Sequence, residues 1–268
     1  AVVIVEDGSS DRTDKVLAGH FGDYPFCMRV FTQKHKGPAA ARNIGIRNAR
    51  GELLLFLGDD IIADAELLEE HTRWHRQYPL ESVGVLGFVT WAAHIRITPF
   101  MHWLENGGPQ FHYGHLAGKT EASWKYFYTA NVSVKKDFLV RNEFFFDESF
   151  PYAAFEDSEL AFRLSKHGFK LMFHCDARGY HDHPTTLEGA CRRMEILGFS
   201  GQILAGKVPD FAYFHDGIKR RGIIRRSIRF VRFLWHWARA KYYEKRSIKP
   251  AVFEAVLRYC WLQGCLRY

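Results

Sequence analysis

Short apolar runs alternate with amphipathic stretches along the first 190 residues. Runs rich in aliphatic, β-branched and aromatic residues predict strands at 2–5, 28–32, 53–57, 83–89, 126–134 and 170–174. Helical spacing and capping residues predict helices that begin near Ser10 or Asp11 and cover 38–49, 64–78 and 156–167. This alternation predicts an α/β fold with a mostly parallel sheet flanked by helices.

The periodic pattern ends in two places. Residues 90–123 are rich in aromatic, Gly and His residues, which favours long loops over an active site. From Leu187 onward the pattern becomes mainly helical. We therefore expect an α/β domain at 1–190 and a helical extension at 191–268.

Size and composition limit the class of protein. At 268 residues with 47% hydrophobic content, the chain can bury one substantial core. No apolar stretch reaches the roughly 18 residues that a membrane span needs, and the five cysteines have neither metal-ligand nor disulfide spacing. A reducing, cytoplasmic location is the expectation that follows.

Positive charge is concentrated near the end of the chain. The stretch 218–246 has a net charge of +10, whereas the remainder has a net charge of −3. Apolar residues recur there at helical spacing (Ile224, Ile228, Val231 and Trp235), with arginines among them. Such a helix can lie on an anionic membrane surface, on the inner face of a membrane, or pack on the α/β domain with a solvated basic face. Nucleic acid is not expected, because the rest of the chain is acidic and has no nucleic-acid motif.

Two acidic pairs are the main candidates for chemistry. Asp59 and Asp60 directly follow the apolar run 53–58, and Glu156 and Asp157 open a predicted helix. Ligands of α/β sheets bind at the carboxyl ends of strands, and paired carboxylates there suit Mg²⁺ or Mn²⁺ with a phosphate-bearing partner. The alternative for each pair is helix capping.

Six segments in order carry a family resemblance. They are VEDGSSD at 5–11, GPAAARNIG at 37–45, FLGDD at 56–60, ANVS at 130–133, EDSELAFRL at 156–164 and YHDH at 180–183. Together they resemble the family 2 glycosyltransferases, which have the Rossmann-like GT-A fold. The resemblance implies metal-dependent, inverting transfer of a sugar from a nucleotide-diphospho sugar to a hydroxyl of a saccharide, lipid-linked or protein acceptor. Cell-surface polysaccharide, glycolipid or glycoprotein assembly is the expected setting.

The resemblance also implies nucleotide contacts. Asp7 matches the acidic residue that contacts the base, and Arg42 lies where a guanidinium meets phosphate or base edges. Asp59 remains beside Asp60 in the motif at 56–60 and can reach the ribose or the metal. Capping of the following turn by Asp7 and a solvated helix charge at Arg42 remain open as alternatives.

The metal ligands implied by the family are Asp60 and His181. Asp60 matches the second Asp of the family's D-x-D motif, whereas Gly58 replaces the first. His181 matches the histidine that completes the metal shell, and His183 is an alternative. An imidazole ligand favours Mn²⁺ over Mg²⁺.

Three further residues match the family's catalytic and substrate positions. Asp157 matches the general base that deprotonates the acceptor hydroxyl, with Glu156 beside it at the substrate. Asn131 matches a residue next to the donor sugar or acceptor. Capping by the acidic pair and a buried, backbone-bonded Asn131 are the alternatives.

The family normally begins one strand earlier than this chain. Its first strand leads into a Pro-x-Tyr-Asn-like turn, and that strand is absent here. We therefore expect either a truncated piece or a rearranged N-terminal region. A non-catalytic sugar-nucleotide-binding module and a nucleotidyltransferase remain alternative functions.

Overall fold

The computed structural model describes residues 1–19, 24–109, 113–208 and 223–268, with side chains between 223 and 229 outside the description. The chain forms two compact units, each assembled from segments that are distant in sequence. The first unit contains Ala1–Gly58, Glu66–Gly87 and Glu121–Ala177, and the second contains Asp59–Ala65, Phe88–Thr120 and Arg178–Tyr268. The domain boundary expected near residue 190 stays a prediction.

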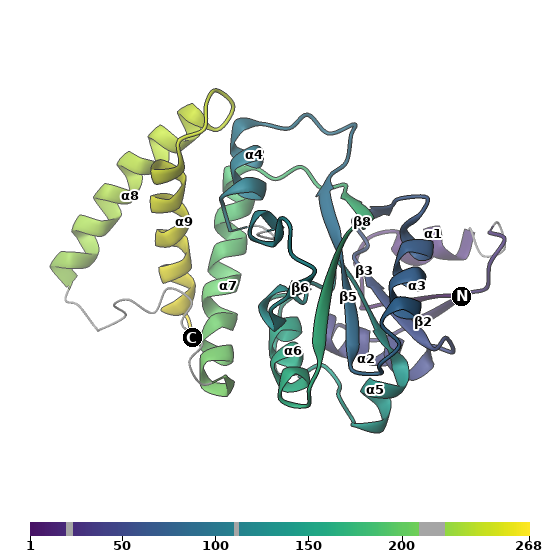
Figure 1. The fold of residues 1–268 in the computed structure, drawn as a ribbon. Helices are drawn as coiled ribbons and strands as arrows, with labels where there is room; N and C mark the ends of the chain where they lie inside the picture. Colours follow the sequence, from purple (N-terminus) through teal and green to yellow (C-terminus); the bar gives the residue numbers. More distant parts are fainter. Residues whose placement is uncertain (20–23, 110–112, 209–222) are drawn as a thin grey trace. The chain divides into compact units, whose positions relative to one another are not determined.

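A two-stranded parallel sheet begins the first unit. Strand β1 (Val2–Glu6) pairs with β2 (Met28–Thr32), so that Val2 lies opposite Met28 and Glu6 lies opposite Thr32. Helices α1 (Thr13–Gly19) and α2 (Pro38–Asn48) follow the two strands (Figure 1). These elements follow the expected ranges closely, since each is encoded by a local run with its own start signal.

The larger sheet has the strand order β3-β7-β5-β8-β4, with β6 paired to β8. Its strands are β3 (Leu53–Leu57), β4 (Ile61–Ala63), β5 (Val83–Trp91), β6 (Glu121–Ala122), β7 (Asn131–Lys135) and β8 (Lys170–His181). Strand β7 is antiparallel to both β3 and β5, so β3 and β5 run in the same direction on either side of it. The pairs β4–β8 and β6–β8 are also antiparallel. The sequence concealed this reversal, because β7 and its neighbours are all short apolar runs.

Helices α3 (Leu67–Gln77), α5 (Lys136–Arg141) and α6 (Glu156–Lys166) belong to the first unit, together with the 3-10 turn η2 (Trp124–Tyr126). Helix α3 buries Leu67, His71 and His75, which are four residues apart. Leu68 is apolar but is 66% exposed, whereas His71 and His75 are buried. The inner face of α3 is therefore partly polar.

The second unit contains a helix in the stretch where only loops were expected. Helix α4 (Pro99–Asn106) begins with Thr98, whose hydroxyl accepts a hydrogen bond from the Met101 N–H. Pro99 occupies the favoured first position. The expectation of loops throughout 90–123 was wrong at this point, although the cap and the proline are both visible in the sequence. The turn η1 (Tyr113–Leu116) follows α4.

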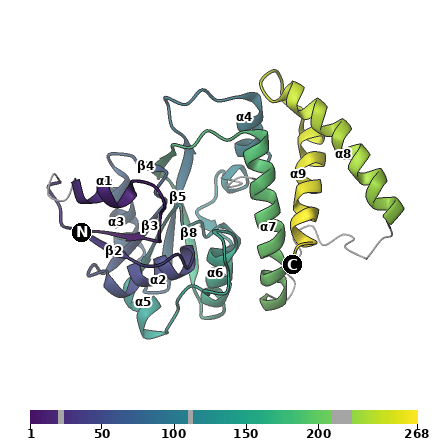
Figure 2. The ribbon, with the colours of Figure 1, turned by 180° about the vertical axis from the view of Figure 1, so that it is seen from behind.

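The C-terminal part of the second unit is helical, as expected. It comprises α7 (Leu187–Lys207), α8 (Ile223–Tyr243) and α9 (Pro250–Cys265). Helices α7 and α9 run side by side in both ribbon views (Figures 1 and 2). A Cβ atom on Gly264 would overlap the carbonyl of Glu195, so glycine permits the close approach of the two backbones. In the described ranges, no helix is long and apolar enough to cross a membrane.

Several strand boundaries differ from those predicted. The strand expected at 126–134 occupies Asn131–Lys135, because residues 124–126 form a 3-10 turn. The strand expected at 170–174 continues to His181. This continuation pairs with β4, which local sequence did not predict, and it brings the motif at 180–183 to the end of β4.

Candidate functional site

Asp60 and His181 meet where β4 pairs with β8 in the second unit. Ile61 lies opposite His181 in the antiparallel register, which places Asp60 beside the histidine. The Asp182 N–H donates a hydrogen bond of 2.7 Å to the Asp60 carbonyl and fixes the backbones. Asp60 Oδ2 then lies 3.2 Å from His181 Nε2. The hydrogen bond from His181 lowers the pKa of Asp60, so its carboxylate is charged at neutral pH.

The histidine ring is held by its surroundings. His181 is largely buried, with its side chain 13% exposed, whereas the Asp60 side chain is 44% exposed. The Trp91 ring contacts His181 edge-on at a centroid distance of 5.4 Å. The His183 ring is also edge-on to His181, with a centroid distance of 5.9 Å. The Asp60 carboxylate is therefore accessible to solvent, and the His181 ring beside it is held in place by its neighbours.

The donor set of this pair suits a divalent ion with open positions. A carboxylate and an imidazole are accepted ligands of Mn²⁺, and a diphosphate and water can supply further oxygens. The described part of the chain contains no group of three or more His, Cys, Asp or Glu side chains that could hold a metal by itself. Asp60 and His181 would therefore supply two ligands to a metal ion, and its remaining ligands would have to come from a bound molecule or water. Asp59 is exposed next to this pair, and Gly58 supplies no ligand.

Asp7 is engaged with the start of α2 in the first unit. Its carboxylate accepts hydrogen bonds from the backbone N–H groups of Lys36 (2.8 Å) and Gly37 (2.9 Å) and from the Gln33 side chain (2.6 Å). His35 Nδ1 lies 3.0 Å from the same carboxylate. Asp7 thus ties the end of β1 to the turn before α2, whereas the capping alternative placed its hydrogen bonds in the turn directly after Asp7. Its nucleotide contact stays a prediction.

Arg42 and Glu156 form an ion pair between α2 and the start of α6. Arg42 Nη1 lies 2.5 Å from Glu156 Oε1, and the Glu156 side chain is only 2% exposed. The second oxygen, Glu156 Oε2, is buried and accepts no hydrogen bond from the residues that the structure describes. Because a buried carboxylate oxygen without a donor is costly, this atom is a candidate acceptor for a hydroxyl of a bound ligand.

Backbone strain precedes the acidic pair of α6. Phe155 has φ 69° and ψ −4°, a left-handed conformation that is unfavourable for a bulky residue. The first turn of α6 then carries Glu156, Asp157 and Glu159. Asp157 Oδ1 accepts a hydrogen bond of 2.7 Å from the Ser158 N–H, and its side chain is partly exposed. Strain of this kind is concentrated at functional sites, where surrounding contacts maintain it.

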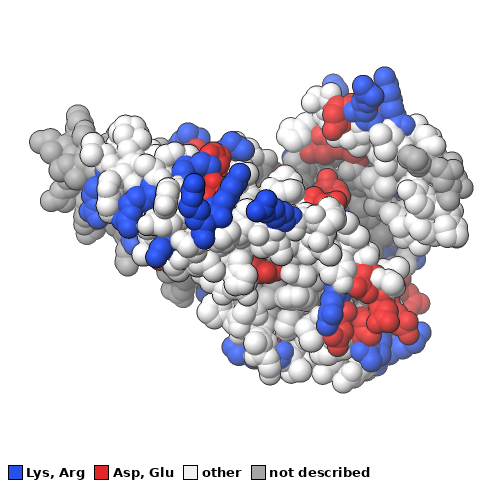
Figure 3. All heavy atoms as spheres, turned by 90° about the horizontal axis from the view of Figure 1, so that it is seen from above, with Lys and Arg blue, Asp and Glu red and all other residues white. Residues whose placement is uncertain are grey.

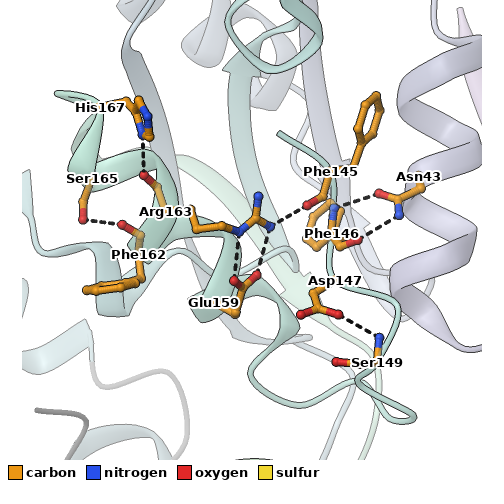
Figure 4. Close-up of polar contacts among 10 residues, drawn as sticks. All are labelled: Asn43, Phe145, Phe146, Asp147, Ser149, Glu159, Phe162, Arg163, Ser165 and His167. Atoms are coloured by element: carbon orange, nitrogen blue, oxygen red, sulfur yellow. Dashed lines mark hydrogen bonds and ion pairs between the residues drawn. The ribbon is translucent and has the colours of Figure 1, made fainter. Parts of the chain in front are cut away.

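A set of hydrogen bonds, here called the brace, links α2, α6 and the segment at 145–149 (Figure 4). Asn43 donates from Nδ2 to the Phe146 carbonyl and accepts at Oδ1 from the Phe146 N–H, at 2.9 and 2.8 Å. Arg163 binds both carboxylate oxygens of Glu159 and donates to the Phe145 carbonyl. The loop and the two helices are thereby fixed to one another.

Asn131 lies in a buried chain of hydrogen bonds between β7, α3 and β8. Asn131 Nδ2 donates to the Ala177 carbonyl, and Oδ1 lies 2.9 Å from His71 Nε2. Ser133 Oγ lies 2.8 Å from both His71 Nδ1 and His75 Nε2. The chain ends at Lys135, whose Nζ lies 3.1 Å from His75 Nδ1.

Only one assignment of protons satisfies every contact of this chain if both histidines are neutral. Lys135 donates to His75, His75 donates to the Ser133 hydroxyl, Ser133 donates to His71, and His71 donates to Asn131. Burial lowers the pKa of His71 to about 4 and that of His75 to about 3, so both rings are neutral near pH 7. Asn131 is fully buried, as its structural alternative expected, and its substrate role stays a prediction.

The candidate residues are divided between the two units. The first unit holds Asp7, Arg42, Asn131, Glu156 and Asp157, and it brings Arg42 and Glu156 into contact. The second holds Asp59, Asp60 and His181, and it brings the latter two into contact.

Sequence reasoning assigned no role to three buried polar residues around these positions. Asn43, His71 and Ser133 are each at most 3% exposed. Asn43 and Ser133 stand inside recognised motifs, and His71 stands at an apolar position of a predicted helix. A polar residue on an apolar helix face was the available signal, because such a residue needs a partner in the core.

Comparison with protein families gives a match over the first part of the chain. The family model described as Glycosyl transferase family 2 matches residues 1–127. Among curated relatives, the uncharacterized glycosyltransferase YfnE of Bacillus subtilis is 26% identical over 229 residues. This match covers 69% of the chain and 57% of YfnE, so the chain spans little more than half the length of that relative.

Solved structures resemble the chain over nearly its whole length. Mannosyltransferase PcManGT from Pyrobaculum calidifontis, in complex with GDP-Man and Mn2+, has a TM-score of 0.61 at 16% identity. That comparison covers 99% of this chain and 76% of the other. S. aureus TarS 1-349 in complex with UDP has a TM-score of 0.54 at 16% identity and covers 100% of this chain and 79% of the other.

These comparisons confirm the expected GT-A type of α/β fold. Residues 1–127 are similar in sequence to the glycosyltransferases of family 2. At 16% identity, the structural likeness concerns the fold alone. Donor, metal and acceptor must be argued from the residues of this chain.

Proposed function

We propose that this chain, as a relative of the family 2 glycosyltransferases, transfers a sugar from a nucleotide-diphospho sugar to an acceptor hydroxyl with inversion at the anomeric carbon. The main support is the contact between Asp60 and His181, which lie 3.2 Å apart where the start of β4 pairs with the end of β8. This contact joins a carboxylate and an imidazole that are more than a hundred positions apart in the chain. Both groups can bind a divalent ion that also binds a diphosphate.

Asp60 and His181 hold the metal in this proposal. A bound Mn²⁺ or Mg²⁺ supplies neutralisation of the negative charge that develops on the diphosphate leaving group. The lowered pKa of Asp60 keeps its carboxylate ionised, which a metal ligand needs. Trp91 and the backbone hydrogen bond from Asp182 keep the two ligands in place.

Asp7, Arg42 and Asp59 bind the nucleotide in this proposal. Asp7 accepts three hydrogen bonds from its own chain, and a carboxylate offers about four acceptor sites, so one site remains for a base N–H if the His35 ring moves aside. Arg42 carries a permanent charge on a side chain that is 25% exposed. Asp59 lies exposed beside the metal ligand and can accept from a ribose hydroxyl.

Asp157 is the general base of the proposed reaction. Its carboxylate takes the proton of the acceptor hydroxyl while that oxygen forms a bond to the anomeric carbon. The bond from the anomeric carbon to the diphosphate breaks, and the nucleoside diphosphate leaves with the electron pair. Glu156 Oε2 binds the sugar or acceptor, and the buried Asn131 acts on its position through the hydrogen bonds that hold β7. Glu156 offers a buried oxygen that needs a donor, which an acceptor hydroxyl can supply.

The test is a screen of nucleotide sugars by thermal unfolding with and without Mn²⁺. A ligand that binds the native state raises its melting temperature, so the correct donor should stabilise the protein in a metal-dependent way. Transfer should then release a nucleoside diphosphate. Release of pyrophosphate would identify a nucleotidyltransferase, and binding without turnover on any acceptor would identify a non-catalytic binder. Either result would overturn the proposal.

The acceptor belongs to cell-surface polysaccharide, glycolipid or glycoprotein assembly in this proposal. The supporting observation is the basic C-terminal stretch at 218–246, of which residues 218–222 lie outside the described residues. An array of saccharide and lipid-linked acceptors, incubated with the donor found in the screen, would test the assignment.

A further inference from the structure

Helix α8 has an inner face that packs within the second unit. Phe233 stacks on Tyr259 of α9 at a centroid distance of 4.3 Å. Ala240 is fully buried, and Glu244, just after the helix, is 3% exposed. These positions recur at helical spacing, so one side of α8 is already occupied.

The outer face of α8 is apolar and exposed. Val231 is 65% exposed, Trp235 57% and Tyr242 56%, and Phe230 and Leu234 are each close to half exposed. Val231, Trp235 and Tyr242 recur at spacings of four and seven residues, which places them on one side of the helix. Single exposed apolar residues are ordinary, but five along three turns form a continuous surface.

Basic side chains flank this outer face. The Arg239 guanidinium lies 4.3 Å from the centroid of the Trp235 ring, and that of Arg246 lies 4.5 Å from the Tyr242 ring. Arg232 and Lys245 are also exposed. The cationic groups therefore lie directly beside the aromatic residues.

The acidic residue of this segment does not offset that charge at the surface. Glu244 is buried and accepts hydrogen bonds from the Leu187 N–H and from Lys241, at 2.7 and 2.6 Å. On the face drawn in Figure 3, basic and acidic side chains gather in mixed clusters. Glu244 therefore does not neutralise the exposed basic side chains beside the outer face of α8.

We infer that the outer face of α8, defined by Phe230, Val231, Leu234, Trp235 and Tyr242, docks onto an anionic lipid bilayer. Aliphatic and aromatic side chains on such a helix enter the region between headgroups and acyl chains, while flanking Arg and Lys meet lipid phosphates. Trp and Tyr favour this interfacial depth because they combine apolar rings with a polar group. The helix lies in the plane of the membrane surface.

The composition of the face favours lipid over the other possible partners. Single-stranded nucleic acid is bound by aromatic platforms with basic residues, but the exposed aliphatic residues Val231 and Leu234 would gain nothing from bases. Protein interfaces are also rich in Tyr, Trp and Arg, so the arginines over the exposed rings do not separate a protein partner from lipid. The net charge of +10 in the stretch 218–246 is what favours an anionic bilayer. Anionic lipid headgroups bind the basic side chains of α8, and acyl chains bind its apolar side chains.

Sedimentation with vesicles tests the inference directly. The protein should bind vesicles of phosphatidylcholine with about a third phosphatidylglycerol far better than vesicles of phosphatidylcholine alone, and added salt should weaken binding. Leu234→Ser with Trp235→Ala should reduce the partition coefficient by about tenfold or more. Arg232→Glu with Arg239→Glu should cause a similar loss.

Matched variants control for general changes of surface. Leu68→Ser with Leu80→Ser removes two exposed apolar side chains from the first unit, and Lys119→Glu with Lys170→Glu makes the same charge change at exposed lysines. Both should bind vesicles like the unaltered protein. Circular dichroism and the melting temperature should establish that each α8 variant is folded.

Three results would overturn the inference. They are equal binding to neutral and anionic vesicles, equal losses in the α8 and control variants, and no vesicle binding at all. If the protein does not bind vesicles but binds an oligonucleotide or itself in a way that depends on Trp235, the outer face of α8 is a site for that partner instead. Donor binding is measured separately without lipid, so failure here leaves the proposed sugar transfer untouched.

Discussion

Asp60 Oδ2 lies 3.2 Å from His181 Nε2, although 121 positions separate the two residues in the chain. The antiparallel pairing of β4 and β8 creates this contact, because it places Ile61 opposite His181. The pair is the most specific feature that the structure adds to the candidate chemistry.

Replacing either member of this pair should abolish metal-dependent donor binding. Asp60→Asn and His181→Ala each remove one of two protein ligands, so metal affinity should fall by about a hundredfold or more. Isothermal titration of Mn²⁺ in the presence of donor measures the loss. His94→Ala is the matched control, because His94 lies 2.8 Å from Asp182 and is exposed. An unchanged affinity in both ligand variants would exclude this metal site.

Asp157→Asn should separate catalysis from donor binding. The amide keeps the size of the side chain but cannot accept the proton of the acceptor hydroxyl, so kcat should fall by about 10²- to 10⁴-fold. Donor affinity should stay within about twofold, which thermal stabilisation can check. Asp137→Asn, an exposed change on α5, should leave both quantities unaltered. Normal turnover of the Asp157 variant would refute its role as base.

Arg42→Ala should destabilise the fold as well as weaken nucleotide binding. The substitution leaves the Glu156 carboxylate buried without its cation, which costs about 3–5 kcal/mol in comparable pairs. Urea unfolding should therefore show a lower free energy of unfolding for this variant. Adding Glu156→Gln removes the isolated charge, so the double variant should recover part of the loss. Additive losses in the double variant would mean that the ion pair is not coupled.

Stability should fall on mild acidification because His71 and His75 are buried as neutral rings. The pKa of His71 is about 4 in the folded protein and near 6.5 when unfolded, so the unfolded chain binds the additional proton between these values. The stabilising contribution is complete above pH 6.5 and is lost as the pH falls towards 4. For His71 it amounts to roughly 3 kcal/mol. His75 acts in the same direction.

Melting temperatures measured between pH 7 and pH 4 should therefore decrease. His71→Gln should flatten this dependence, since its amide does not titrate, although the variant should be less stable at pH 7. His167→Gln, at an exposed position after α6, is the control and should keep the full slope. A pH dependence that is identical in the His71 variant and the native sequence would contradict the assignment.

Local sequence determined most elements of the first unit. The strands at 28–32 and 53–57 occupy the predicted residues, and α2 and α6 begin where Pro38 and Glu156 indicated. Short apolar runs and start signals act through neighbours in the chain, so they are readable without tertiary context. Helix α4 was not predicted, although Thr98 and Pro99 are typical of a helix start, because its aromatic sequence is also typical of a loop.

The sequence also indicated the candidate residues of the site, but it did not indicate which residues they would contact. The motifs at 56–60 and 180–183 named Asp60 and His181 as candidate ligands, and the pairing of β4 with β8 brought them into contact. No local pattern indicated that Arg42 would bind Glu156, or that His71 and Ser133 would hold Asn131.

The sequence by itself determined which chemical groups this protein carries and which segments form helices and strands. Only the tertiary structure decided strand direction around β7, the partners of its buried charges and the two faces of α8. The physical reason is the range of the interactions. Backbone propensity and capping depend on residues a few positions apart, whereas strand pairing and charge burial depend on residues that meet only after the chain has folded.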